Sequence, residues 1–147
     1  CPDATWVYDS TTNRCFRAFA ASPVTGVCNK DVPCVGLAAQ YGVPSALAYT
    51  LNFQALVDAG LIGIANSIGT LVYYVGITDL VTRFEYMLDD GTPVPLASIL
   101  PFFAPGQPND TPANTRNYII TGNVKFDDNM CPSPSDYGSI CQIQLTP

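Results

Sequence analysis

Residues 102–112, FFAPGQPNDTP, gather the side chains of this sequence that are best suited to bind a cation. Gln107, Asn109 and Asp110 follow a Pro-Gly turn signal, and their amide and carboxylate oxygens are ligands that calcium prefers. The same residue types are ordinary turn residues, so a loop without a metal ion is the competing interpretation. The segment predicts either a calcium-binding loop or a turn with the outline of one.

Asn109-Asp110-Thr111 is also a sequon for N-glycosylation. A glycan on Asn109 would block any ligand site in this loop with the protein's own sugar. An unmodified Asn109 that caps a turn is the alternative.

The residue types exclude the common nucleophilic mechanisms. The sequence has no histidine, so Ser-His-Asp and Cys-His arrangements cannot form, and Glu85 is its one glutamate. No pair of aspartates stands out as a hydrolytic pair. We therefore predict a protein without catalytic residues.

Length and charge restrict the class of protein further. The 147 residues are 48% apolar and 12% charged, which predicts one domain over residues 1–147 with a hydrophobic core. The net charge is −6 and the six basic residues are scattered, which argues against binding to nucleic acid. The most apolar region, 55–81, is interrupted by Asp58, Asp79 and several glycines, so we expect no membrane insertion.

The six cysteines indicate disulfide bonds and an oxidising compartment. They are Cys1, Cys15, Cys28, Cys34, Cys131 and Cys141. The sequence begins at Cys1 rather than at a methionine, as a secreted protein does after removal of its signal peptide. We therefore expect a secreted, extracellular protein, although the spacing alone does not choose among the 15 pairings of six cysteines.

Turn residues and hydrophobic patterns predict the order of elements. The order is a hairpin at 6–19, helices at 31–42 and 51–60, a central strand at 70–78, a long loop from 88, and strands within 118–128 and 139–145. Asp31 is the expected cap of the first helix, Pro33 suits its first turn and Gly42 its end. We expect the aromatic residues near the central strand to be core: Tyr73, Tyr74, Phe84, Tyr86, Phe102 and Phe103. This segregation of elements predicts an α+β fold with an antiparallel sheet.

Six motifs in this order resemble the C-type lectin-like domain over nearly the whole chain. The first nineteen residues are similar to the N-terminal hairpin of its long form, which has its own disulfide. YYVGITD resembles the family's Trp-Ile-Gly-Leu core strand, FEYMLDDGTPV its Phe-x-Trp-x-Asp-Gly stretch, and APGQPND its calcium loop. KFDDNMC and YGSICQI stand where the family has Trp-Asn-Asp before a cysteine and Phe-Ile-Cys-Glu. The resemblance implies two helices, antiparallel sheets, a long irregular loop region and disulfide staples.

The resemblance implies three disulfides, with two departures from the family pattern. Ala38 stands where the family has its helix cysteine, and Tyr118 replaces the cysteine that follows the calcium loop. The implied pairs are Cys1–Cys15, Cys34–Cys141 and Cys28–Cys131. A Cys28–Cys34 bond, which would leave Cys131–Cys141, is the alternative.

Carried over by position, the calcium ligands would be Gln107, Asn109, Asp127 and Asp128, with a cis peptide bond before Pro108. Gln107-Pro108-Asn109 mixes the family's two sugar-specificity triplets and predicts neither sugar preference. The family's glutamate ligand is Arg116 here, and its guanidinium would pair with Asp127 or Asp128 instead. The resemblance therefore predicts an incomplete calcium site.

The leading functional hypothesis is a recognition domain that binds a glycan or an extracellular protein through residues of this loop, Asp110 included. The alternative is a structural subunit of an extracellular matrix or self-assembling filament. This alternative depends on a neutral surface and on apolar residues in an expected loop. If those residues are exposed, they would form the contact of a homo-oligomer. They are Leu96, Ile99, Leu100, Phe102 and Phe103.

Overall fold

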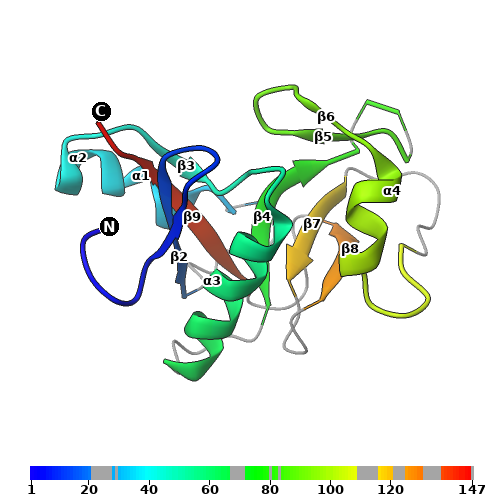
Figure 1. Ribbon diagram of the computed structural model, residues 1–147, viewed down its shortest axis with the longest axis horizontal. Helices are drawn as coiled ribbons and strands as arrows, with labels where there is room; N and C mark the ends of the chain where they lie inside the picture. The colour runs from blue at the N-terminus through cyan, green and yellow to red at the C-terminus, as the bar shows by residue number, and fades with distance from the viewer. Residues whose placement is uncertain are drawn as a thin grey trace.

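A computed structural model describes residues 1–20, 28, 30–66, 72–79, 81–82, 84–108, 116–120, 125–130 and 137–146, without the side chains of 116–120 and 128–130. One curled mixed sheet runs in the order β1-β2-β9-β4-β5-β6, with β3 paired to β9 and the β7–β8 hairpin joined to β4. Its strands are β1 (Val7–Asp9), β2 (Arg14–Phe19), β3 (Ser45–Leu47), β4 (Tyr73–Thr78), β5 (Tyr86–Leu88), β6 (Pro93–Val94), β7 (Arg116–Ile120), β8 (Phe126–Met130) and β9 (Gly138–Gln144). Figure 1 shows helices α1 (Val32–Val35) and α2 (Leu37–Tyr41) at one end of the molecule, α4 (Leu96–Ile99) at the other, and α3 (Phe53–Ala65) between them.

The N-terminal hairpin forms as predicted. β1 pairs with β2 from Val7 opposite Phe16 to Asp9 opposite Arg14. In the turn between them, Asn13 adopts a left-handed φ of 52°, which asparagine tolerates better than most residues. β2 then pairs along its whole length with β9, which joins the two ends of the described chain.

The first predicted helix is interrupted at Gly36, so it forms the two short helices α1 and α2. Pro33 in the first turn and the left-handed Gly42 at the end, with φ of 69°, confirm two of the predicted signals. The predicted cap was wrong, because the side chain of Asp31 makes no capping hydrogen bond and lies 3.3 Å from Nζ of Lys30.

Helix α3 is displaced from its predicted limits of 51–60 and runs from Phe53 to Ala65. The glycine that was expected to end it, Gly60, is instead a buried position inside the helix. Gly63 lies so close to β2 that an added Cβ would be 2.5 Å from Cβ of Ala18. Tertiary packing therefore overrides the helix-ending tendency of glycine.

Strand β4 is central and completely buried, as its apolar sequence predicted. It pairs antiparallel with β5 and β7 but parallel with β9, where Tyr73 lies opposite Gly138. The predicted α+β fold is confirmed, and its sheet is antiparallel except at this contact, which makes it mixed. The parallel pair arises because β9, the last strand of the chain, lies between β2 and β4. The β7–β8 hairpin, which precedes β9 in the sequence, is joined to the other side of β4.

Two hydrophobic clusters hold the elements together. One includes Phe16, Leu56, Tyr73 and Phe126 and joins α3 to the sheet; the other includes Trp6, Leu37 and Tyr74 and joins α1 and α2 to it. Within the described part of the chain, no helix is both long and apolar enough to cross a membrane.

Two of the three predicted disulfides are confirmed. Cys1 is bonded to Cys15 and Cys34 to Cys141, so the alternative Cys28–Cys34 bond was wrong. Cys28 is also disulfide-bonded. Its predicted partner, Cys131, lies outside the described residues.

Candidate ligand-binding loop

The chain after β6 is more regular than predicted. Two short helical segments, α4 and the 3-10 helix η1 (Leu100–Phe102), replace the beginning of the expected long loop. Ile99 and Phe103 are buried, whereas Leu96 and Leu100 are exposed. This alternation fixes the segment to the core by one side only.

Phe126 on β8 holds the start of the candidate loop. Phe103 forms a parallel β-bridge with Phe126, and the N–H of Ala104 donates to the Phe126 carbonyl at 2.9 Å. The Phe126 ring lies 5.9 Å from that of Phe103, 6.3 Å from Phe102 and 6.1 Å from Phe53 on α3. The fully buried Phe126 therefore joins the loop, β8 and α3.

Gln107 and Asp127 lie on the two segments that Phe126 joins. The N–H of Gln107 donates to the carbonyl of Ala104 at 3.0 Å and closes a turn through Gly106, whose φ of 82° favours glycine. The Gln107–Pro108 peptide bond is cis, as the resemblance implied. Gln107 and Asp127 are both half-buried.

The other predicted ligands cannot be placed in the same way. Asn109, the predicted glycosylation site, and Asp110 lie outside the described residues. Asp128 pairs with Tyr118 in the β7–β8 register, and Arg116 pairs with Met130, two residues along β7. Their side chains are not described, so a contact between Arg116 and either aspartate stays a prediction.

At one position the sequence departs from the family's calcium donor set. Calcium takes six to eight oxygens, and Arg116 supplies a cation where the family pattern has a carboxylate. Within the described residues, no three His, Cys, Asp or Glu side chains come together as a metal site. The described part of the site contributes the amide of Gln107 and the carboxylate of Asp127.

The structure forms a groove beside β5 and β6 that was not predicted from the sequence. Its volume is about 400 Å³, and its lining includes Phe84, Glu85 and Leu96. Phe84 is 42% exposed with a left-handed φ of 63°, while its N–H donates to the buried Asp79 carboxylate at 3.1 Å. The prediction of a core position was therefore wrong for Phe84, and its charged neighbours in the sequence, Arg83 and Glu85, were the available signal.

The remaining aromatic predictions agree with the structure. Tyr73, Tyr74, Tyr86 and Phe103 are buried, and Phe102 is half-buried in the cluster around Phe126. These rings are part of the core and do not form an exposed stacking surface.

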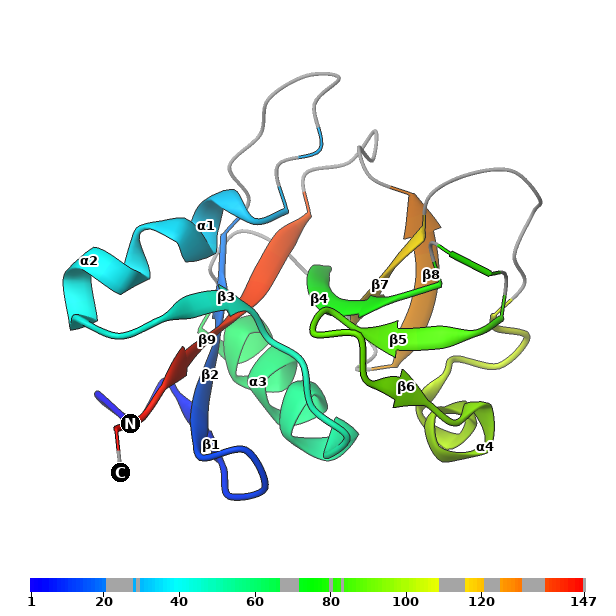
Figure 2. The same ribbon diagram turned by 90° about the horizontal axis from the view of Figure 1, so that it is seen from above.

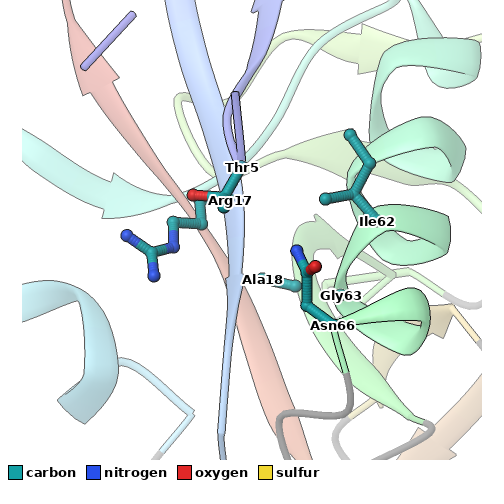
Figure 3. A pocket seen from close by; sticks show the side chains of 6 residues that line it. All are labelled: Thr5, Arg17, Ala18, Ile62, Gly63 and Asn66. Carbon is teal, nitrogen blue, oxygen red and sulfur yellow. The ribbon is translucent and has the colours of Figure 1, made fainter. Parts of the chain in front are cut away.

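A second, smaller crevice of about 220 Å³ lies between β2 and the end of α3 (Figure 3). The guanidinium of Arg17 points away from α3 and lies over the rings of Phe19 and Trp6, at 5.1 and 5.9 Å. The hydroxyl of Thr5 already donates to the Asp3 carboxylate. The polar groups of Arg17 and Thr5 are therefore directed elsewhere, which leaves the Asn66 amide among the lining residues, and the crevice is a weaker candidate than the loop.

No family model matches the sequence, and no curated protein matches it significantly. Among solved structures, the chain is similar to the C-type lectin CEL-I from Cucumaria echinata, with a TM-score of 0.68, 18% identity and 99% of both chains covered. It is also similar to the carbohydrate-recognition domain of the human scavenger receptor C-type lectin, with a TM-score of 0.64, 16% identity and 99% of both chains covered. A calcium-independent type II antifreeze protein has a TM-score of 0.59 and 21% identity, with 99% of this chain and 95% of that chain covered.

The chain therefore has the C-type lectin-like fold. The Cys1–Cys15 disulfide in the N-terminal hairpin identifies the long form of that fold, as the resemblance implied. At identities near 20%, these likenesses show the fold and leave the ligand to be inferred from the site.

Proposed function

We propose that this chain is a secreted, non-catalytic recognition domain that binds an extracellular glycan or protein through the loop around Gln107, without a resident calcium ion. The observation that carries the proposal is the attachment of the loop to β8. The Phe103–Phe126 bridge and the Ala104–Phe126 hydrogen bond fix the base from which Gln107 extends. A fixed base lowers the entropy that a ligand must remove on binding.

The polar groups beside this base suit a hydrogen-bonding ligand. Gln107 offers an amide and Asp127 a carboxylate, and both sugar hydroxyls and peptide N–H groups donate to such oxygens. Among proteins of similar structure, a domain of cow CD23 was solved in the presence of an oligosaccharide, and the antifreeze protein is described as calcium-independent. Glycan recognition and calcium independence therefore both occur on this fold.

The disulfides support secretion, because such bonds persist in oxidising compartments. The lack of histidine in the sequence supports a role without acid–base catalysis.

The proposal is tested by screening the intact protein against a glycan array and against extracellular proteins, in excess EDTA. We expect a ligand that binds in EDTA and is lost in a Gln107→Ala/Asp127→Ala double variant. The matched control is Gln54→Ala/Asp58→Ala, which removes the same residue types from α3, where Gln54 donates to Asp58 at 2.9 Å. Binding that survives the loop variant would refute the role of the loop.

The calcium part of the proposal is tested separately by thermal melting in millimolar calcium and in EDTA. A site at 100 times its dissociation constant would add about 2.7 kcal/mol, or several degrees for a domain of this size. We expect equal melting temperatures. A clearly higher melting temperature in calcium than in EDTA would show that Arg116 does not prevent calcium binding. It would support a calcium-dependent mechanism instead.

A self-assembling structural subunit is the second candidate. The apolar patch predicted after β6 is smaller than expected, because Ile99 and Phe103 are buried and Phe102 is half-buried. Leu96 and Leu100 remain 38% and 45% exposed and favour this candidate. Light scattering at micromolar concentration decides, since a strict monomer there argues against stable assembly.

A further inference from the structure

The groove beside β5 and β6 lies on the outer side of that hairpin. Side chains alternate between the two faces of a strand, and Tyr86 and Val94, which pair with each other, are buried at 2% and 4% exposure. Met87 and Pro93 form the next pair and therefore point to the opposite face, where they line the groove. Figure 2 shows β6 as the outermost strand at this end of the molecule, beside α4. The groove is therefore open to a partner from outside.

The lining of the groove is apolar and contains one charged side chain. The chain enters β5 through Phe84 and Glu85 and leaves β6 through Pro95 and Leu96, and all four residues are exposed and line the groove. Glu85 supplies the charge and is also the one glutamate of the sequence. A carboxylate in apolar surroundings selects among partners by their charge, which an uncharged surface cannot do.

Phe84 is held at the end of the groove in a conformation that phenylalanine rarely adopts. Its φ of 63° lies in the left-handed region, and the residue is 42% exposed. Its N–H donates to the carboxylate of Asp79, which is itself 6% exposed, at 3.1 Å. Backbone strain of this kind persists where the surrounding structure enforces it, and it concentrates at ligand sites. The strain therefore indicates that Phe84 belongs to a binding surface.

The backbone at this edge of the sheet does not accept an added strand. The N–H of Leu88 donates to the carbonyl of Thr92 at 2.9 Å, so the backbone groups of Thr92 and Val94 face β5. The backbone groups that face outward belong to residues 93 and 95, and both are prolines without an N–H. A partner must therefore bind the groove through side chains.

The exposure of the lining favours a side chain of another protein over a small molecule. Sites for small molecules bury roughly 70–90% of the ligand's surface, which requires an enclosed cavity. Most of the residues that line this groove are instead exposed: Phe84, Glu85, Pro93, Pro95 and Leu96. Protein interfaces are also rich in aromatic residues and methionine, which Phe84 and Met87 supply.

The carboxylate of Glu85 selects a cationic side chain. In the part of the chain that the structure describes, Glu85 makes no ion pair. An apolar or acidic cover would remove water from this carboxylate and leave it unpaired, which is unfavourable. Arginine suits the whole lining, since its guanidinium pairs with a carboxylate and stacks on an aromatic ring while its stem covers apolar groups. The chain itself uses such stacking, because the guanidinium of Arg14 lies 4.6 Å from the ring centre of Tyr49.

We propose that the groove beside β5 and β6 binds an arginine side chain of a partner protein, with the guanidinium between the Phe84 ring and the Glu85 carboxylate. The net charge of −6 favours the approach of such a basic partner. This site is separate from the loop around Gln107 and does not depend on the proposed function. One side chain in an open groove binds weakly, so we expect a dissociation constant on the order of 1 mM for a short peptide.

The probe for this site is the blocked peptide acetyl-Leu-Arg-Leu-amide, in which arginine carries the one charge. It is titrated into the intact, isotope-labelled protein while the amide NMR shifts are followed. We expect saturable shifts confined to residues 84–88 and 92–96, with weaker binding in about 0.5 M salt, because salt screens the charge attraction. The matched control peptide has citrulline, which keeps the shape of arginine without its charge, and it should bind about three- to tenfold more weakly.

Two variants separate the contributions of the carboxylate and the ring. Glu85→Gln should lose most of the preference for arginine over citrulline, because it keeps the side-chain shape without the charge. Phe84→Asn should weaken both peptides and change the melting temperature little, since asparagine tolerates the left-handed region. The matched controls are Asp58→Asn on α3, which removes the same charge, and Tyr8→Ala on β1, where Tyr8 is 53% exposed. Both controls should bind the peptides as the wild type does.

Four results would overturn the proposal. The first two are equal binding of the arginine and citrulline peptides, and no saturable shift up to about 10 mM peptide. The third is a preference for arginine that survives Glu85→Gln, or shifts centred on Gln107. The fourth is a set of shifts in β5 and β6 that depend on protein concentration without peptide, because a second copy of the chain would then occupy the groove.

Discussion

At the scale of single residues, Asp9 shows how a buried carboxylate can be held without a cation. It accepts hydrogen bonds from the N–H and hydroxyl of Thr11 at 3.1 and 2.8 Å, the hydroxyl of Thr12 at 2.7 Å and the amide of Asn52 at 3.0 Å. Burial raises the pKa of Asp9, but hydrogen bonds from Thr12, Asn52 and Thr11 outweigh this and lower it from 3.8 to about 2. The hairpin turn is thereby joined to the start of α3.

The lowered pKa of Asp9 makes stability depend on pH at the acidic end. A carboxyl with a folded pKa of about 2 stabilises the protein fully above its unfolded pKa near 4 and loses that effect as the pH falls toward 2. The contribution is about 2 kcal/mol. We expect urea denaturation to show that Asp9→Asn loses less stability than the wild type between pH 5 and pH 2.

Asp58→Asn is the control for Asp9→Asn, because the Asp58 carboxylate accepts one hydrogen bond from Gln54 within α3. Its stability should follow the wild type over this pH range. Parallel curves for Asp9→Asn and the wild type would contradict the assignment.

Gly63 is a packing position at the crossing of α3 and β2. An added Cβ would lie 2.5 Å from Cβ of Ala18 and 2.8 Å from the Tyr73 hydroxyl. We expect Gly63→Ala to lower the free energy of unfolding by roughly 1–3 kcal/mol, despite the better helix propensity of alanine. Urea denaturation measures this change.

Gly36→Ala is the comparison for Gly63→Ala, since its Cβ meets nothing within 4 Å and its φ is −72°. It should raise stability by about 0.4–1 kcal/mol. Equal effects at the two glycines would mean that α3 moves away from β2 at little cost.

At the scale of elements, β9 is the strand that organises the sheet. It pairs with β2 on one side and with β3 and β4 on the other, and Cys141 ties it to α1. A strand that is buried on both faces shows little alternation of apolar and polar residues. The prediction of β9 therefore depended on its position in the family pattern as much as on its residues.

The two confirmed disulfides should stabilise unequally, because they close loops of very different length. Their sequence separations are 107 residues for Cys34–Cys141 and 14 for Cys1–Cys15. Loop-closure entropy predicts a loss of about 4.7 kcal/mol for Cys34→Ala/Cys141→Ala and about 3 kcal/mol for Cys1→Ala/Cys15→Ala. Chemical denaturation of both double variants checks the order, and a larger loss at Cys1–Cys15 would contradict it.

Local signals in the sequence were sufficient for the elements with strong turn chemistry. The N-terminal hairpin and the left-handed Gly42 at the end of α2 both agree with prediction. Gly60 and the parallel β4–β9 pair were misread, because both depend on contacts with residues far away in the sequence. Local secondary-structure propensity contains no information about such contacts.

The residue types of the candidate site were easier to predict than the contacts that hold its loop in place. Gln107 was singled out by its residue type, whereas Asp127 and the cis bond before Pro108 were implied by the resemblance. The role of Phe126 was not found, since a phenylalanine in a strand gives no sign that it will hold a loop more than twenty residues earlier. Only the bridge to Phe103 reveals it.

At the scale of the whole molecule, the ligand loop lies away from the first two helices. α1 and α2 occupy one end, while β8 and α4 occupy the other (Figures 1 and 2).

The pairing of β2 with β9 also sets a schedule for biosynthesis. Arg14 and its partner Gln144 are 130 residues apart, so β2 leaves the ribosome long before the strand that covers its edge. At about 5–20 residues per second, this interval is roughly 7–26 seconds. During that time the growing chain has an open strand edge and half of a core, which are the features that chaperones bind. The strand pairing that joins the two ends of the described chain thus leaves β2 exposed during most of synthesis.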